Sequence, residues 1–234
     1  MANAEILNLK PQCVWAHFYE LTQIPRPTGH MKEVTQFIAD FGKSLDLETE
    51  QDKVGNVLIR KPAAKGFESK QTVILQSHLD MVPQKNSDIK HDFTKDPIET
   101  YVDGDKVKAR YTTLGADNGI GVAMMMAVLE DNTLNHPAIE ALFTVDEEVG
   151  MNGAFGLQKG VLKGTLMLNL DTEEEGELCV GCAGGTDVNV TFRYKEDVEI
   201  DKGDVAFKIS LRGLKGGHSG TQIHLGRANA NKLM

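Results

Sequence analysis

The fold of this chain is decided by the stretch Thr72-Val-Ile-Leu-Gln-Ser-His-Leu-Asp80. Its first four residues form a continuous apolar run, unlike the alternating pattern of a strand with one solvated face. Two later runs share this character, Ala141-Leu-Phe-Thr-Val145 and Leu166-Met-Leu-Asn-Leu170. Such runs predict central strands that are covered by helices on both faces.

Helical patterns lie before and between these strands. A helix rich in Met and Ala is predicted over Gly119–Glu130, between the first two buried strands. Apolar side chains at helical spacing predict two earlier helices, Pro11–Thr22 and Met31–Leu45, and a strand pair follows at Leu47–Gln51 and Asn56–Lys61. This order predicts an α/β fold with a mainly parallel central sheet flanked by helices.

The hydrophobic pattern of the sequence changes near Gly184, from continuous apolar runs to alternating residues. Asp187–Tyr194 and Val205–Arg212 alternate strictly between apolar and polar residues, which predicts half-exposed antiparallel strands. We therefore expect an α/β domain over residues 1–184 and the beginning of a smaller α+β domain over residues 185–234.

The overall composition excludes several classes of protein. Of the 234 residues, 41% are apolar and 25% charged, as in ordinary globular proteins. The formal net charge of −9 argues against nucleic acid or an anionic membrane as a partner. No signal peptide and no long apolar segment are visible, so we expect a cytoplasmic protein.

The three cysteines indicate a reducing compartment rather than a disulfide framework. Cys179 and Cys182 form a single C-x-x-C, whereas a zinc ribbon needs a second pair. We interpret these two residues as small buried thiols without a chemical role.

Metal-ligating residue types follow each buried strand and precede the predicted helix. They are His78, Asp80, Asp117, Glu147, Glu148 and Asp171. Ligand sites of open α/β sheets lie beyond the carboxyl ends of the strands, so these side chains are expected at one edge. One imidazole among several carboxylates is typical of a first-row metal site, and such a cluster of acids repels itself unless cations neutralise it. Two Zn2+ ions fit this charge better than one, with Co2+ or Mn2+ as alternatives.

Each of these features also has an ordinary structural interpretation. A lone His-x-Asp occurs by chance, Glu147-Glu148 could be a solvated turn, and Asp117 could cap the following helix. The Gly115–Gly121 loop could cradle a phosphate, but it has neither dinucleotide nor P-loop spacing and Asp117 would repel the anion. The joint placement at successive strand ends favours the metal site.

The chain resembles the dinuclear zinc peptidase family that includes carnosinases and aminoacylases. The matching segments are Gln76–Pro83, Thr113–Gly121, Leu142–Gly150, Asn169–Gly176 and Gly216–Gly220. Asp171-Thr-Glu-Glu-Glu-Gly176, followed by Cys179-Val-Gly-Cys-Ala-Gly-Gly185, narrows the resemblance to members that hydrolyse Xaa-His dipeptides such as β-alanyl-histidine. The resemblance implies a zinc-binding catalytic domain followed by a lid and dimerisation domain, with a small peptide as substrate and a homodimer at full length.

The resemblance also implies a role for each residue. His78 and Asp171 bind one zinc, Glu148 binds the other, and Asp117 bridges both. Glu147 is the general base, Asp80 orients His78, and His218 in the Gly216–Gly220 loop stabilises the oxyanion.

One ligand of the family pattern has no counterpart here. The family has a further histidine near the end of a longer chain, which none of His17, His30, His91, His136 and His224 matches. Asn229–Met234 has the pattern of a helix interior without a stop signal, so we expect an N-terminal part of a longer enzyme. The alternatives are a non-catalytic metal-binding fragment, a tripeptidase or an N-acyl amino acid hydrolase.

Overall fold

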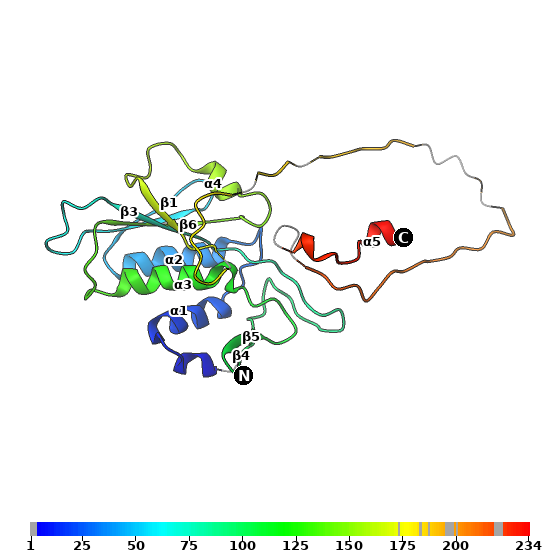
Figure 1. Cartoon of the computed structure of the whole chain (residues 1–234), viewed down its shortest axis with the longest axis horizontal. Helices are drawn as coiled ribbons and strands as arrows, with labels where there is room; N and C mark the ends of the chain where they lie inside the picture. Colours follow the sequence, from blue (N-terminus) through cyan, green and yellow to red (C-terminus); the bar gives the residue numbers. More distant parts are fainter. Residues whose placement is uncertain are drawn as a thin grey trace. The chain divides into compact units, whose positions relative to one another are not determined.

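Figure 1 shows the computed structural model of the chain, which describes residues 4–172, 174–182, 184–186, 188–194, 199, 201–217 and 222–234. The chain divides into two compact units, Met1–Cys182 and Ala183–Met234. Every strand found among the described residues belongs to the first unit.

The first unit is built on a five-stranded sheet in the order β1-β2-β6-β3-β7. The strands are β1 Glu48–Gln51, β2 Val57–Lys61, β3 Val73–His78, β6 Ile139–Thr144 and β7 Leu166–Asn169. β3 lies parallel to β6 and β7, whereas β2 pairs antiparallel with β1 and β6. The predicted α/β class is confirmed, and the three continuous apolar runs are the three parallel strands. The prediction of a covered central strand is wrong for β7, which lies at the edge of the sheet with all four residues exposed.

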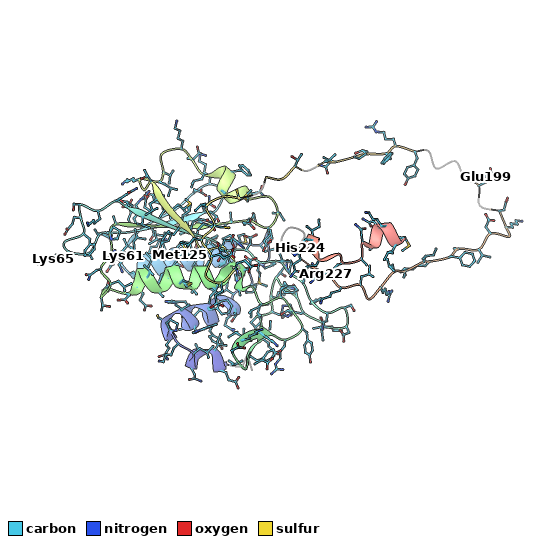
Figure 2. All side chains as sticks on the ribbon, viewed as in Figure 1. Lys61, Lys65, Met125, Glu199, His224 and Arg227 are labelled. Carbon is cyan, nitrogen blue, oxygen red and sulfur yellow. The ribbon has the colours of Figure 1, made fainter. Side chains whose placement is uncertain are left out.

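The three long helices lie where the sequence predicts them, at α1 Gln12–Gln23, α2 Lys32–Ser44 and α3 Ala116–Glu130. They lie on one side of the sheet (Figure 1), with α2 against β1 and β2, α3 against β3, and α1 against α3. α3 is apolar all round, as expected for a helix packed between a sheet and another helix. Met125 in α3 (Figure 2) is fully buried.

The expectation of helices on both faces of the sheet is wrong for the long helices. On the opposite face, three inward side chains form a small second core. They are Leu58, Ile74 and Leu142, and they pack against Leu157, Val161 and Leu162. A patch of this size is covered by the loop that follows the short helix α4 (Asn152–Gly156), so no long helix is needed there.

Short elements complete the first unit and were not predicted. They are the 3-10 helix η1 (Ala4–Asn8) and the antiparallel pair β4 (Thr100–Asp103) and β5 (Lys106–Ala109). Lys61 at the end of β2 (Figure 2) fastens α3 to the sheet, since its ammonium donates to the carbonyls of Leu129 at 2.9 Å and Asp131 at 2.6 Å.

The second unit contains η2 (Ile223–Leu225) and α5 (Ala230–Leu233) among its described residues. The antiparallel strands predicted there are not found: residues 188–194 and 201–217 form neither helix nor strand. Their apolar side chains are exposed, with Phe192 at 84% and Phe207 at 86% of full exposure. A strand needs a hydrogen-bonded neighbour, and the described part of this unit offers none to these segments. α5 begins at Asn229, whose side chain caps it, rather than continuing an earlier helix.

Two smaller expectations concern the cysteines and membranes. Cys13, Cys179 and Cys182 are exposed free thiols, so the interpretation of Cys179 and Cys182 as buried is wrong. Within the described ranges, no helix has the length and apolar character needed to cross a membrane.

Candidate metal centre

The carboxyl ends of the parallel strands bring the predicted ligands to one edge of the sheet. His78 is the last residue of β3 rather than part of the segment after it, and Thr144 of β6 lies beside it in the parallel register. Glu147 and Glu148 follow the end of β6, and Asp171 follows β7 by two residues. The parallel pairing of β6, β3 and β7 therefore brings residues that are far apart in the sequence into a single cluster.

His78 is the centre of this cluster and is almost completely buried. Its Nε2 atom lies 2.9 Å from Oδ1 of Asp117 and 3.7 Å from Oδ1 of Asp171. Single ligand atoms from His78, Asp117 and Glu148 all lie within 4.8 Å of one another. An imidazole nitrogen and two carboxylate oxygens at this spacing can hold a divalent metal ion.

Asp80 holds the other side of the histidine ring and is fully buried. Its carboxylate lies 3.3 Å from Nδ1 of His78, so Nε2 is the nitrogen left to face the carboxylates. The same carboxylate accepts backbone hydrogen bonds from Glu147 at 3.0 Å and Glu148 at 3.2 Å, and one from the Thr28 hydroxyl at 3.0 Å. Asp80 thus ties the loop after β6 to the end of β3.

The pKa values reflect an excess of negative charge in this cluster of side chains. Burial alone would lower the pKa of His78, but the carboxylates of Asp117, Asp80 and Asp171 outweigh it and raise the pKa to about 10. Burial, followed by repulsion from Asp117, raises the pKa of Glu148 to about 7. Burial likewise raises the pKa of Asp171, and Asp117 adds to this although His78 opposes it. A divalent cation would reduce the repulsion between these carboxylates and would take the place of the bound protons.

Asp80 behaves in the opposite way. Burial acts to raise its pKa, but hydrogen bonds from His78 and from the backbone of Glu147 and Glu148 hold the pKa of this carboxyl below its ordinary value. Asp80 is therefore a permanent anion beside the ring, which is the usual partner of a metal-ligating histidine.

The start of α3 presents Asp117 to the site. The N-cap residue is Gly115, in the left-handed region at φ 71°, and Asp117 itself departs from helical geometry at φ −83° and ψ 108°. Its carboxylate lies against His78, so the structure does not support the interpretation of Asp117 as an ordinary helix cap.

Two residues that the sequence analysis did not single out contact the site, and one predicted site residue is not described by the structure. Arg26 and Thr28 contact the ends of the site loops, although neither residue was among the candidates from the sequence. A buried arginine of this kind gives no local signal, because its partners are distant in sequence. His218 lies outside the described residues.

The family of the chain follows from its sequence, and its fold agrees with those of similar solved structures. Residues 74–210 match Peptidase family M20/M25/M40, and the chain belongs to this family. It is 50% identical over 231 residues to the cytosol non-specific dipeptidase of Escherichia coli, covering 99% of this chain and 47% of that protein. It is 27% identical over 213 residues to the uncharacterized protein YqjE of Bacillus subtilis, covering 84% of this chain and 54% of that protein.

Among solved structures, the chain resembles the aminoacylhistidine dipeptidase of Vibrio alginolyticus. The TM-score is 0.77 at 45% identity, covering 98% of this chain and 46% of that one. A tripeptidase from Staphylococcus aureus shares the fold, with a TM-score of 0.58 at 23% identity over 74% of this chain and 44% of that one. The chain spans about half the length of the curated relatives that it matches.

Proposed function

We propose that this chain carries the metal-binding part of a zinc-dependent dipeptidase. The observation that carries the proposal is the meeting of His78, Asp117 and Glu148 within 4.8 Å at the carboxyl edge of the sheet. Membership of a peptidase family and the names of the two similar dipeptidases support it.

The donor set fits a pair of divalent ions. In our proposal His78 and Asp171 hold one ion, Glu148 holds the other, and Asp117 bridges them, with zinc preferred over Co2+ or Mn2+. The Nε2 atom of His78, directed at Asp117 and Asp171, supports this division. When bound, the ions would polarise the peptide carbonyl and lower the pKa of a water molecule.

Glu147 is proposed as the general base. Its carboxylate would accept the proton of the attacking water and deliver it to the leaving amine nitrogen. Two observations support this role: Asp80 fixes its backbone N–H, and its charge contributes to the raised pKa of both Glu148 and Asp171. Asp80 keeps His78 oriented. The oxyanion role of His218 rests on the family resemblance alone.

The substrate is proposed to be a dipeptide, with Xaa-His dipeptides such as β-alanyl-histidine among those cleaved. One similar protein is called non-specific and the other an aminoacylhistidine dipeptidase, so cleavage of further dipeptides is compatible with the proposal. We also propose a cytosolic location, a homodimer at full length, and residues 1–184 and 185–234 as the metal-binding domain and the beginning of a lid domain.

The test is hydrolysis of a substrate panel by the zinc-loaded protein. It would include β-alanyl-histidine, a dipeptide without histidine, a tripeptide and an N-acyl amino acid, each with and without a chelator. The proposal expects cleavage of dipeptides that stops when the metal is removed. Zinc binding without hydrolysis would indicate a non-catalytic metal-binding protein, and preference for the tripeptide or the N-acyl compound would refute the proposed substrate.

A further inference from the structure

A buried arginine lies directly behind the metal centre. Arg26 follows α1 and is only 2% exposed. Its Nη1 atom donates to the carbonyl of Leu79 at 2.9 Å and lies 3.4 Å from the carbonyl of Asp80. Its Nη2 atom donates to the carbonyl of Gly115. One guanidinium therefore joins the loop after β3, which follows His78, to the turn that presents Asp117.

The glycines around Asp117 are explained by this guanidinium. A Cβ atom on Gly115 would lie 2.6 Å from Nη2 of Arg26, and one on Gly119 would lie 2.4 Å from the same atom. Neither distance is compatible with an ordinary side-chain contact. The two glycines on either side of Asp117 thus leave the space that Arg26 fills, which is a packing reason for a loop that resembles a phosphate cradle in sequence.

The backbone of the arginine segment is fastened to the same loop. The amide of Met81 donates to the carbonyl of Arg26 at 3.2 Å, and the Thr28 amide donates to the carbonyl of Met81 at 3.3 Å. Thr28 also reaches the Asp80 carboxylate through its hydroxyl. The backbone from which the Arg26 side chain extends is therefore fixed to the loop after β3.

The positive charge of Arg26 lies close to the carboxylates of Asp80 and Asp117. Burial lowers the pKa of Arg26 to about 10, against the opposing effect of Asp80 and Asp117, so the group is a cation at neutral pH. Taking an arginine out of water is unfavourable unless carbonyls and anions compensate for it. The nearby anions, Asp80 and Asp117, belong to the candidate metal centre, so the cation partly compensates the negative charge of this centre.

We propose that Arg26 is a positioning residue of the metal centre, which sets the spacing between the His78–Asp80 loop and the Asp117 turn. This inference rests on the proposed function, because it assumes that His78 and Asp117 share a metal. Among the contacts described, the guanidinium touches no ligand side-chain atom and acts through the backbone carbonyls of Leu79, Asp80 and Gly115. Its planar fork reaches carbonyls of both segments at once, which a lysine ammonium cannot reproduce.

The test compares Arg26→Lys with Arg60→Lys. Arg60 is also a poorly exposed arginine, but it pairs with Glu48, Glu50 and Glu140 near the beginning of β6, away from the site. Zinc affinity would be measured by competition with a chromogenic chelator, on protein shown by circular dichroism to be folded. The visible spectrum of the Co2+-loaded protein would report ligand geometry.

Arg26→Lys is expected to bind zinc about 10- to 100-fold more weakly, as for other groups that orient metal ligands, and to change the Co2+ spectrum. Arg60→Lys is expected to change neither, although it can lower thermal stability. If Arg26→Lys does not fold, Gly119→Ala keeps the charge and displaces the guanidinium, and the same loss of affinity is expected. A folded variant of Arg26 or Gly119 with unchanged affinity and spectrum overturns the inference.

The zinc measurement separates this inference from the dipeptidase proposal. Wild-type protein that binds zinc but cleaves no peptide would refute the proposed function, and the affinity of Arg26→Lys would still decide the role of Arg26. Active wild-type protein with an unaffected Arg26→Lys would refute only the positioning role. Wild-type protein that binds no zinc would refute both.

Discussion

Glu147 and Glu148 are neighbours in sequence, yet the site gives them different surroundings. Glu148 contributes an oxygen to the group with His78 and Asp117, and burial with nearby charge raises its pKa to about 7. Glu147 is outside that group, although its backbone is held by the same Asp80 carboxylate. A peptide hydrolase needs both a ligand and a proton carrier, and two adjacent residues on a tight loop can supply one each.

Substitution of these two residues should separate metal binding from turnover. Glu147→Gln is expected to keep its zinc and to lose about 10²- to 10⁴-fold in kcat, the usual contribution of a general base. Glu148→Gln is expected to lose metal from one position. Zinc stoichiometry and dipeptide turnover would be measured on each variant, so that each serves as the control for the other. Loss of metal from Glu147→Gln with retained kcat would reverse the two roles.

The raised pKa values also predict how the metal-free protein responds to pH. His78 is raised from 6.5 to about 10, so the stability it adds is present at low pH and is lost as pH rises through about 10. Glu148 is raised from 4.5 to about 7, and its contribution is likewise lost as pH rises through about 7. Bound zinc reverses this trend, because metal binding displaces protons from its ligands.

Thermal unfolding with and without chelator would show this effect. The unfolding temperature of the chelated protein should fall relative to that of the zinc-loaded protein as pH is raised from about 5 to about 9. The His78→Gln variant should show a smaller change with pH. A gap between the two forms that narrows as pH rises would contradict the assignment of these groups to the metal.

At the scale of elements, the site depends on close packing of α3 against the ends of β3 and β7. A Cβ atom on Gly121 of α3 would lie 2.5 Å from the Ser77 hydroxyl, 2.3 Å from Asn118 Oδ1 and 2.9 Å from the carbonyl of Leu170. Ser77 and Leu170 directly precede His78 and Asp171. The helix therefore approaches the strands as closely as a glycine allows, and this approach sets where the ligands can meet.

Gly121→Ala should consequently destabilise the protein despite the better helix propensity of alanine. Overpacking against two polar side chains and a carbonyl is expected to cost about 1–3 kcal/mol in the free energy of unfolding. Denaturant unfolding would measure it, with Gly181→Ala as the matched control because a Cβ there meets nothing within 4 Å. Equal stabilities of the two variants would show that α3 can move away from β3.

At the scale of the whole molecule, the two units differ in what they bury. The first unit has a continuous core from Ile6 to Val145. In the second unit, the described apolar side chains of residues 188–194 and 205–209 are exposed. Exposed apolar side chains promote association when they gather into a patch that nothing else covers.

Residues 1–234 expressed alone are therefore expected to self-associate. Sedimentation should show dimers or larger species, and replacing Phe192 and Phe207 by Ser should shift the distribution towards monomer. Phe155→Ser is the control, because Phe155 is 80% exposed but lies in the first unit. A monodisperse wild-type monomer would contradict the prediction.

The sequence by itself determined the class of the fold and predicted which edge of the sheet carries the candidate site. Continuous apolar runs identified the three parallel strands, although β7 lies at the edge of the sheet and is exposed, and ligand-type residues after parallel strands meet at one edge. These are local patterns, and they located the three long helices, the strands of the central sheet and the edge at which His78, Asp117 and Glu148 lie together. The division of the candidates into metal ligands and other roles came from the family resemblance and stays a prediction. The antiparallel strands expected after Gly184 had the right pattern but lack a partner in the described structure.

The tertiary structure alone decided which residues support the cluster. Asp80 reaches the Glu147 backbone across 67 residues, and Arg26 reaches Gly115 across 89 residues. The order β1-β2-β6-β3-β7 and the placement of the long helices on one side are likewise set by contacts between distant segments. The periodicity of a segment predicts which of its faces is buried, but it does not predict which other segment packs on that face. The partner is set by packing and hydrogen bonding between parts of the chain that are distant in sequence.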